Sequence, residues 1–190
     1  PLLEILVERL QRAPGLDGVV IATTRNETDE PIVALGKRLG VGVFRGSEHD
    51  VLGRVCGALR ASGADVCVEI TGDCPLIDPE IVEQILRMYD AHDAVYVSNC
   101  GVRSYPDGID VQVFPLEALR RSAAMTGDRL DHEHVTLHMR NHPEIFPAVN
   151  LVAPPSLHWP ELGLTLDEEG DYRLLRALIE HFHARPLFGC

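Results

Sequence analysis

The segment 71–76, Thr-Gly-Asp-Cys-Pro-Leu, has residue types that suit a metal or phosphate site. It follows an apolar run of strand length at 64–70, which places the carboxylate of Asp73 beside a glycine at a strand end. A carboxylate there can hold Mg²⁺, and a glycine lets the backbone approach a phosphate closely. The competing interpretation is a helix-entry turn with a solvated aspartate, and the segment alone leaves both open.

A second group of carboxylates lies near the end of the chain, where Asp167 is followed by Glu168, Glu169 and Asp171. In one interpretation Asp167 is the N-cap of a helix, and the helix dipole favours the acidic first turn. In the other, Asp167 is a second ligand for the metal that Asp73 holds. Taken alone, the N-cap interpretation is the simpler one, because aspartate is common at N-caps.

Three histidines form a further candidate site. His134, His138 and His142 are four residues apart, so they share a face if the helix is continuous. That spacing can bind zinc. Because no carboxylate is placed beside them, we interpret them as ordinary histidines of a partly exposed helix, with a cluster at a dimer contact as an alternative.

The elements that position these residues alternate between strands and helices through the first half of the chain. We expect strands at 18–22, 41–44, 64–70 and 94–98, and helices at 2–10, 31–39, 47–61 and 78–89. Ser47, with Asp50 three residues later, resembles a capping box for the third helix. The order predicts an α/β fold: a doubly wound, mostly parallel sheet with helices on both faces, of Rossmann-like type. Such sheets bind ligands at the carboxyl ends of their strands, where the segment 71–76 falls.

The pattern changes after Asn99. A turn at 105–108 leads into an alternating strand at 109–114. We then expect helices at 116–125 and 128–141, a strand at 145–152 and a last helix at 168–183. No repeat or low-complexity tract interrupts the pattern, so we interpret residues 1–190 as a single domain.

Composition excludes several classes of function. The net charge of −12 argues against broad nucleic-acid binding, which needs a basic face, although a small anionic substrate requires only a local site. The apolar runs are too short to span a bilayer, so we expect no membrane insertion. The five cysteines are odd in number and form no Cys-x-x-Cys pair, which indicates reduced thiols in a cytoplasmic protein: Cys56, Cys67, Cys74, Cys100 and Cys190.

Seven short motifs occur in an order that resembles a known family. They are Ala22-Thr-Thr24, Phe44-Arg-Gly-Ser47 with Asp50-Val-Leu-Gly-Arg54, Ile70-Thr-Gly-Asp-Cys-Pro-Leu-Ile-Asp78, Tyr96-Val-Ser-Asn99, Tyr105-Pro-Asp-Gly-Ile-Asp110, Glu133-His-Val-Thr136 and Leu164-Thr-Leu-Asp167. Together they resemble the spore-coat polysaccharide biosynthesis cytidylyltransferases (SpsF-like), which are related to synthetases of CMP-activated 3-deoxy-sugar acids. The likeness covers nearly the whole chain.

The resemblance implies a reaction and a metal. A hydroxyl of a sugar or sugar acid attacks the α-phosphorus of CTP, giving a CMP-sugar and pyrophosphate for surface polysaccharide synthesis. Asp73 matches the carboxylate that such enzymes use for Mg²⁺, and Asp167 matches the second metal carboxylate, so both are expected to be catalytic. A metal bound there would neutralise phosphate charge and make pyrophosphate a better leaving group.

The resemblance also assigns the residues that bind substrates. Arg45 lies where relatives have a nucleotide-contacting arginine, and Thr71 lies where they often have glutamine beside the base. Gly72 completes the expected nucleotide-binding set. Asp110 and Asn99 lie in segments expected to contact the sugar.

Relatives of this type are homodimers, and residues 99–150 correspond to the part expected to serve dimerisation and substrate binding. The family pattern normally begins with a strand and a Gly-Ser-x-Arg-x-Pro-x-Lys loop that holds the triphosphate. Neither occurs in this chain. We therefore expect the chain to be a fragment or to follow a further segment, because that first strand usually lies in the middle of the sheet.

Two other functions compete with the enzyme. A truncated or degenerate relative could act as a binding or assembly module without turnover. A nucleotide-sugar glycosyltransferase of similar topology would carry an Asp-x-Asp motif after a strand, and none follows Ile70.

Overall fold

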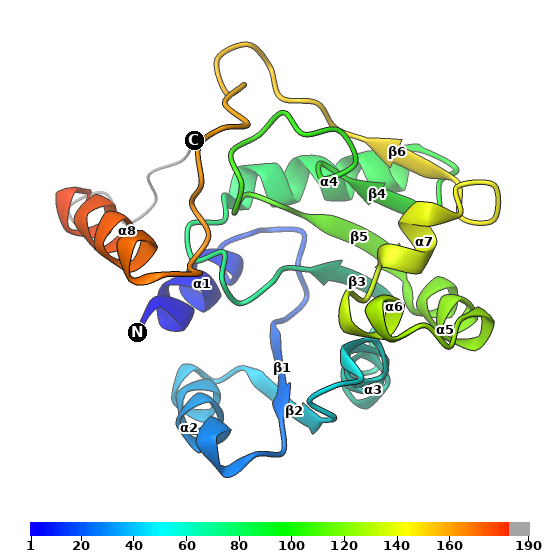
Figure 1. The fold of residues 1–190 in the computed structure, drawn as a ribbon, viewed down its shortest axis with the longest axis horizontal. Helices are drawn as coiled ribbons and strands as arrows, with labels where there is room; N and C mark the ends of the chain where they lie inside the picture. The colour runs from blue at the N-terminus through cyan, green and yellow to red at the C-terminus, as the bar shows by residue number, and fades with distance from the viewer. Residues whose placement is uncertain (183–190) are drawn as a thin grey trace.

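A computed structural model describes residues 1–182 of the chain (Figure 1). Its helices are α1 (Leu2–Leu10), α2 (Glu30–Leu39), α3 (Val51–Ser62), α4 (Pro79–Ala91), α5 (Leu116–Met125), α6 (Arg129–Glu133), α7 (Leu137–Asn141) and α8 (Glu169–His181), with a 3₁₀ turn η1 (Glu27–Asp29). Its strands are β1 (Val20–Thr24), β2 (Gly42–Gly46), β3 (Val66–Glu69), β4 (Tyr96–Ser98), β5 (Gln112–Pro115) and β6 (Ala148–Asn150). The end of the expected last helix at 183, and Cys190, lie outside the described residues.

The strands form two separate sheets. β1 and β2 pair in parallel, and β3, β5, β4 and β6 follow one another in a four-stranded sheet. Within the described residues no ladder joins the two sheets.

The expected α/β fold is confirmed, and β5 is the strand that departs from the parallel direction. This strand runs antiparallel to both β3 and β4, whereas β4 and β6 are parallel. The chain passes from β4 to β5 through a loop without a helix. A parallel pairing needs a long crossover, usually a helix, so a strand that returns by a loop can pair antiparallel.

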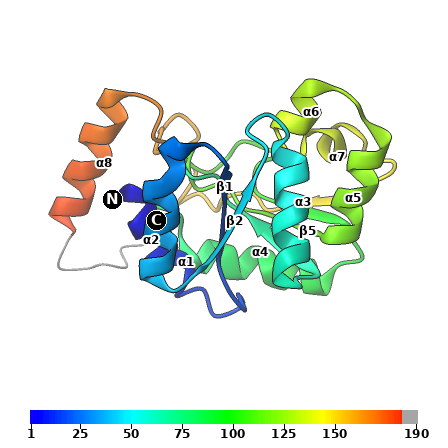
Figure 2. The same cartoon turned by 90° about the horizontal axis from the view of Figure 1, so that it is seen from below.

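Helices cover both faces of the four-stranded sheet, as the sequence predicts (Figures 1 and 2). Alternate residues of β5 point to opposite faces, so Val113 packs with α1, α4 and α8, and Phe114 packs with α3, α5 and α7. Both side chains are fully buried. Burial of each such side chain contributes about 1.5–3 kcal/mol to folding.

Two helix starts differ from the expected ones. Asp50, not Ser47, is the N-cap of α3, and its side chain accepts a hydrogen bond of 2.9 Å from the Gly53 amide. Ser47 instead accepts from the Asp50 amide at 3.0 Å. At α8 the N-cap is Glu168, which forms a capping box with Asp171.

The helix expected at 128–141 is two short helices, α6 and α7. They are separated at Val135, whose φ of 44° lies in the left-handed region that valine rarely adopts. The histidines of this segment therefore do not share one continuous helix face, which corrects that expectation.

In the part of the chain that the structure describes, every helix is too short or too polar to cross a membrane.

Candidate active site at the carboxyl end of β3

The loop after β3 presents Asp73 at the end of the strand. Thr71 and Gly72 are exposed, Asp73 is half-buried, and Cys74 is 2% exposed and anchors the loop. The Cys74 amide closes the turn on the Thr71 carbonyl at 3.2 Å. The following helix is capped by Asp78, whose side chain accepts from the Glu80 amide at 2.8 Å. Entry into α4 therefore does not require the Asp73 carboxylate.

The segment that carries Asp167 lies directly against this loop. The Leu166 amide donates to the Asp73 carbonyl at 2.9 Å, although the two residues are far apart in sequence. The N-cap interpretation of Asp167 is wrong, because Glu168 caps α8. Asp167 is exposed, and its carboxylate accepts the Thr165 hydroxyl at 2.9 Å. Both predicted metal carboxylates thus come from adjacent backbone segments and neither caps a helix.

The turn before Asp110 packs against the same segment. Two backbone hydrogen bonds join Asp107 to it: its amide donates to Leu162, and its carbonyl accepts from Leu164 at 2.7 Å. Gly108 makes this approach possible, since its φ is +98° and a Cβ atom there would lie 2.7 Å from the Leu164 carbonyl carbon.

The environment of Asp110 is anionic. Burial is the largest effect that raises the pKa of its carboxyl group, and the charges of Asp107 and Asp73 add to the rise. Arg103 and Arg140 oppose it. The electrostatic influence of Asp73 links the loop after β3 with the loop that precedes β5.

Asn99 occupies a supporting position under Asp110. Its side chain is 2% exposed; its Nδ2 donates to the Ile109 carbonyl and its Oδ1 accepts from the Val111 amide, both at 2.8 Å. The amide group therefore fixes the backbone on both sides of Asp110. The Asn99 side chain is buried and is not exposed for direct contact with a sugar.

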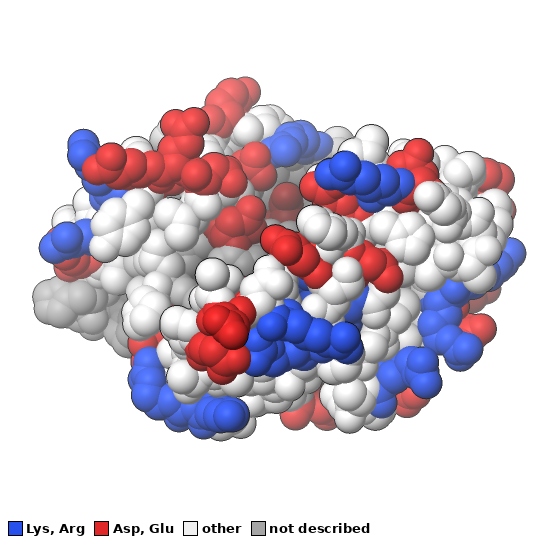
Figure 3. Space-filling view, turned by 60° about the horizontal axis from the view of Figure 1, so that its bottom comes forward, with Lys and Arg blue, Asp and Glu red and all other residues white. Residues whose placement is uncertain are grey.

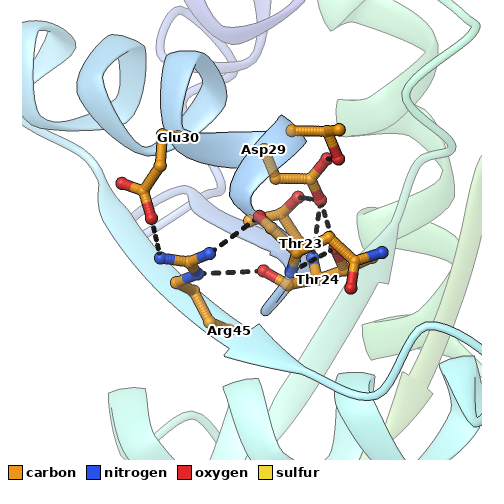
Figure 4. A network of polar contacts seen from close by, with 7 residues as sticks. Thr23, Thr24, Asp29, Glu30 and Arg45 are labelled. Carbon is orange, nitrogen blue, oxygen red and sulfur yellow. Dashed lines mark hydrogen bonds and ion pairs between the residues drawn. The ribbon is translucent and has the colours of Figure 1, made fainter.

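Arg45 holds the turn that follows β1 (Figure 4). Its Nε donates to the Thr24 carbonyl at 2.9 Å and its Nη2 to the Asn26 carbonyl at 3.0 Å, and Nη1 pairs with Glu30. Arg45 is a predicted nucleotide-binding residue, but all three of its guanidinium nitrogens bind other residues of this chain. Arg45 shapes the carboxyl end of β1 and β2 rather than presenting a free guanidinium group.

Asp29 anchors the same turn from the other side (Figure 4). It accepts the hydroxyls of Thr24 and Thr23 at 2.6 and 2.7 Å, together with the Thr24 amide at 3.0 Å. These hydrogen bonds, with that of the Thr24 hydroxyl the largest, lower the pKa of Asp29 to about 2. The turn is therefore held in place by ionic and hydrogen-bonding partners on both sides.

A cavity of about 470 Å³ lies between this turn and the start of α3. Its lining residues are Arg25, Asn26, Phe44, Gly46, Ser47, Glu48, Asp50, Gly53 and Arg54. The Nε atom of Arg54 is buried and has no hydrogen-bond partner among the described residues. Arg54 belongs to one of the sequence motifs, but only the fold shows that its Nε donor is unused.

The three histidines do not converge on one site. His134 ends α6 and is exposed, whereas His138 is buried and its Nδ1 lies 3.1 Å from the Ser122 hydroxyl. The rings of His138 and His142 lie with centroids 4.5 Å apart and are tilted by 43° to one another. Within residues 1–182 no three His, Cys, Asp or Glu side chains are arranged to hold a metal ion.

Asp73 and Asp167 nevertheless fit the way proteins bind magnesium. Mg²⁺ usually takes one or two protein carboxylates and completes its coordination with water and substrate phosphates. Figure 3 shows acidic side chains gathered around a hollow in the surface, with basic side chains nearby. Burial is the largest cause of the raised pKa of Asp110, and a divalent cation would relieve the smaller contribution of repulsion by Asp107 and Asp73.

Comparison with known proteins identifies the family. The cytidylyltransferase family matches residues 1–187. The chain is 36% identical to protein MJ1063 of Methanocaldococcus jannaschii over 95% of this chain and 73% of that protein. It is 32% identical to the spore coat polysaccharide biosynthesis protein SpsF of Bacillus subtilis, over 97% of this chain and 78% of that protein.

A solved structure gives the same answer. A cytidylyltransferase from Leptospira borgpetersenii superimposes with a TM-score of 0.93 at 27% identity, covering 99% of this chain and 79% of that one. The resemblance read from the ordered motifs is confirmed. The chain therefore belongs to the cytidylyltransferase family, a family of nucleotidyltransferases.

Proposed function

We propose that this protein transfers the cytidylyl group of CTP to a sugar or sugar acid in a Mg²⁺-dependent reaction, releasing pyrophosphate. The observation that carries the proposal is the hydrogen bond of 2.9 Å between the Leu166 amide and the Asp73 carbonyl. It brings two carboxylate-bearing segments together at the carboxyl end of β3. The likeness to the Bacillus subtilis spore coat polysaccharide biosynthesis protein supports a role in polysaccharide synthesis.

Asp73 and Asp167 are the proposed metal ligands. When bound, Mg²⁺ would neutralise charge on the phosphates and stabilise the leaving pyrophosphate. Thr71 and Gly72 are exposed beside Asp73, so their backbone is open to a phosphate of the nucleotide. This part of the site would orient the α-phosphorus for attack by the acceptor hydroxyl.

The cavity between the β1 turn and α3 is the proposed place of the rest of the nucleotide. Arg54 and Arg25 both line this cavity and give it two positive charges. Arg45 acts as a positioning residue, since it fixes the turn that forms one wall. Oxygen atoms of a pyrimidine base or ribose would accept hydrogen bonds from guanidinium groups in this cavity.

Asp110 is the proposed contact of the acceptor, and Asn99 positions it. The new bond forms between the acceptor oxygen and the α-phosphorus, and the bond from that phosphorus to the pyrophosphate oxygen breaks. The hydroxyl proton leaves to solvent or a nearby base.

We further propose that the protein works in the cytoplasm as a homodimer. Sedimentation of a clean monomer at micromolar concentration would count against the dimer.

The test uses protein expressed from the whole reading frame. Pyrophosphate release is measured with CTP, UTP, ATP or GTP and a panel of sugars and sugar acids, with and without Mg²⁺. We expect release only with CTP and a divalent cation. Asp73→Asn should abolish it, because a metal ligand is lost.

Asp93→Asn is the matched control, since Asp93 is exposed on a loop away from the proposed site. Full activity of Asp73→Asn would disprove the metal assignment. Nucleotide binding without turnover in the unaltered protein would instead favour the binding module.

A further inference from the structure

A chain of polar side chains crosses the sheet face under α7. The Gln112 amide nitrogen donates to Glu69 at 2.6 Å. Its oxygen accepts two hydroxyls, those of Tyr96 and Thr136, each at 2.6 Å. Three strands and the segment before α7 are thus joined through one side chain, at the carboxyl end of β3.

The position of Thr136 is enforced by an unusual backbone. Val135 is 3% exposed and has a φ of 44°, and the Thr136 amide bonds back to the His134 carbonyl. A β-branched residue rarely adopts this conformation, and strained residues of this kind occur at functional sites. The segment 133–136 is also one of the motifs that define the family likeness, and the proposed function leaves it unused.

Arg140 follows one helical turn after Thr136. Its amide donates to the Thr136 carbonyl at 3.0 Å, and residues four apart in a helix share a face. The side chain of Arg140 is exposed, and the described residues offer its guanidinium group no ion pair or hydrogen bond. Arg140 thus follows the residue that binds Gln112, and its guanidinium group has no ion-pair or hydrogen-bond partner among the described residues.

The charge of Arg140 acts on two carboxyl groups of the proposed site, those of Glu69 and Asp110. Asp110 lies in the loop two residues before Gln112, which is the first residue of β5. Burial raises the pKa of Glu69 to about 7, and the charge of Arg140 opposes that rise. Arg140 has the same opposing effect on Asp110.

We propose that Arg140 recognises an anionic group on the acceptor, and that Gln112, Thr136 and the strained Val135 hold it in place. This inference rests on the proposed function. Nearby negative charges would repel an anionic acceptor unless a cation were presented to it, and Asp107 already pairs with Arg103 at 2.9 Å. Carboxylate and phosphate share the geometry that arginine binds through two parallel hydrogen bonds.

The experiment compares three acceptors with CTP and Mg²⁺: 3-deoxy-manno-octulosonate carries a carboxylate, mannose 6-phosphate carries a phosphate, and mannose is neutral. We expect turnover with one of the anionic acceptors and none with mannose. Arg140→Gln should raise the acceptor KM at least about tenfold with the KM for CTP unchanged. Arg140→Lys should recover part of the loss, which a purely structural role would not explain.

Arg120→Gln is the control, because Arg120 is exposed and pairs with Glu117 on its own helix. Equal use of mannose, or a rise in the KM for CTP in Arg140→Gln, would overturn the inference while leaving cytidylyl transfer intact. Calorimetric titration of each anionic acceptor into unaltered protein and Arg140→Gln gives a readout without turnover. Failure of both anions to bind, or equal binding by the two proteins, would also overturn it.

Discussion

Gly108 shows how a single residue determines the shape of the site. With a φ of +98° it lets the turn before Asp110 lie against the backbone at Leu164. The two hydrogen bonds of Asp107 follow from that approach. Close backbone contact at this point brings together the loops that precede Asp110 and Asp167.

We predict that Gly108→Ala destabilises the fold by about 2 kcal/mol or more, because the added methyl group would meet main-chain atoms and the backbone would be strained. Urea unfolding monitored by circular dichroism measures the loss. Gly127→Ala is the control, since a Cβ there meets no atom within 4 Å. Equal stability of the two variants would show that the turn can move away from Leu164.

Among the secondary-structure elements, α3 and α6 are coupled by one pair of side chains. The Nδ1 of His132 in α6 lies 2.7 Å from the Oδ1 of Asp50, the N-cap of α3, and its Nε2 faces the Thr126 carbonyl. The hydrogen bond with Asp50 is the largest effect that raises the pKa of His132, and Asp131 adds to it. The pair therefore joins the segment before α7 to the wall of the cavity.

A double-mutant cycle with Asp50→Asn and His132→Gln should give a coupling of about 0.5 kcal/mol at pH 6, since the pair is partly exposed. The folded pKa of His132 is above its unfolded value. The stabilisation is therefore fully present below the unfolded pKa of about 6.5 and is lost as the pH rises through the folded pKa. Unfolding in urea at pH 6 and pH 9 measures this; a coupling that is the same at both values would contradict the ion pair.

The sequence predicts most helices and strands, but it does not predict the direction of β5 or the interruption of the helix at Val135. Helices α1 and α5 begin and end where the periodicity places them, because their apolar faces repeat locally. At the break, Val135 has a φ of 44° and Thr136 donates to the distant Gln112, whereas the local pattern predicts a continuous helix there. The alternating pattern of β5 is the same for either strand direction, so its antiparallel pairing with β3 and β4 is seen only in the fold.

For the molecule as a whole, the candidate site depends on contacts between distant segments. Sequence motifs selected Asp73, Asp110 and Asp167, and the fold brings their loops to the same end of the sheet. The motifs could not reveal that Arg45 and Asn99 are bound to their own chain, since those partners come from other loops. Arg54 and Arg140 were also missed, because an unused donor is recognised only in three dimensions.

The central claim is that Asp73 and Asp167 together hold a divalent cation for CTP. Electron paramagnetic resonance of Mn²⁺, a spectroscopic substitute for Mg²⁺, measures cation binding in the presence of CTP. We predict that Asp73→Asn and Asp167→Asn each weaken Mn²⁺ binding at least about tenfold, whereas Asp93→Asn does not. Unchanged Mn²⁺ affinity in either of the first two variants would contradict the shared site.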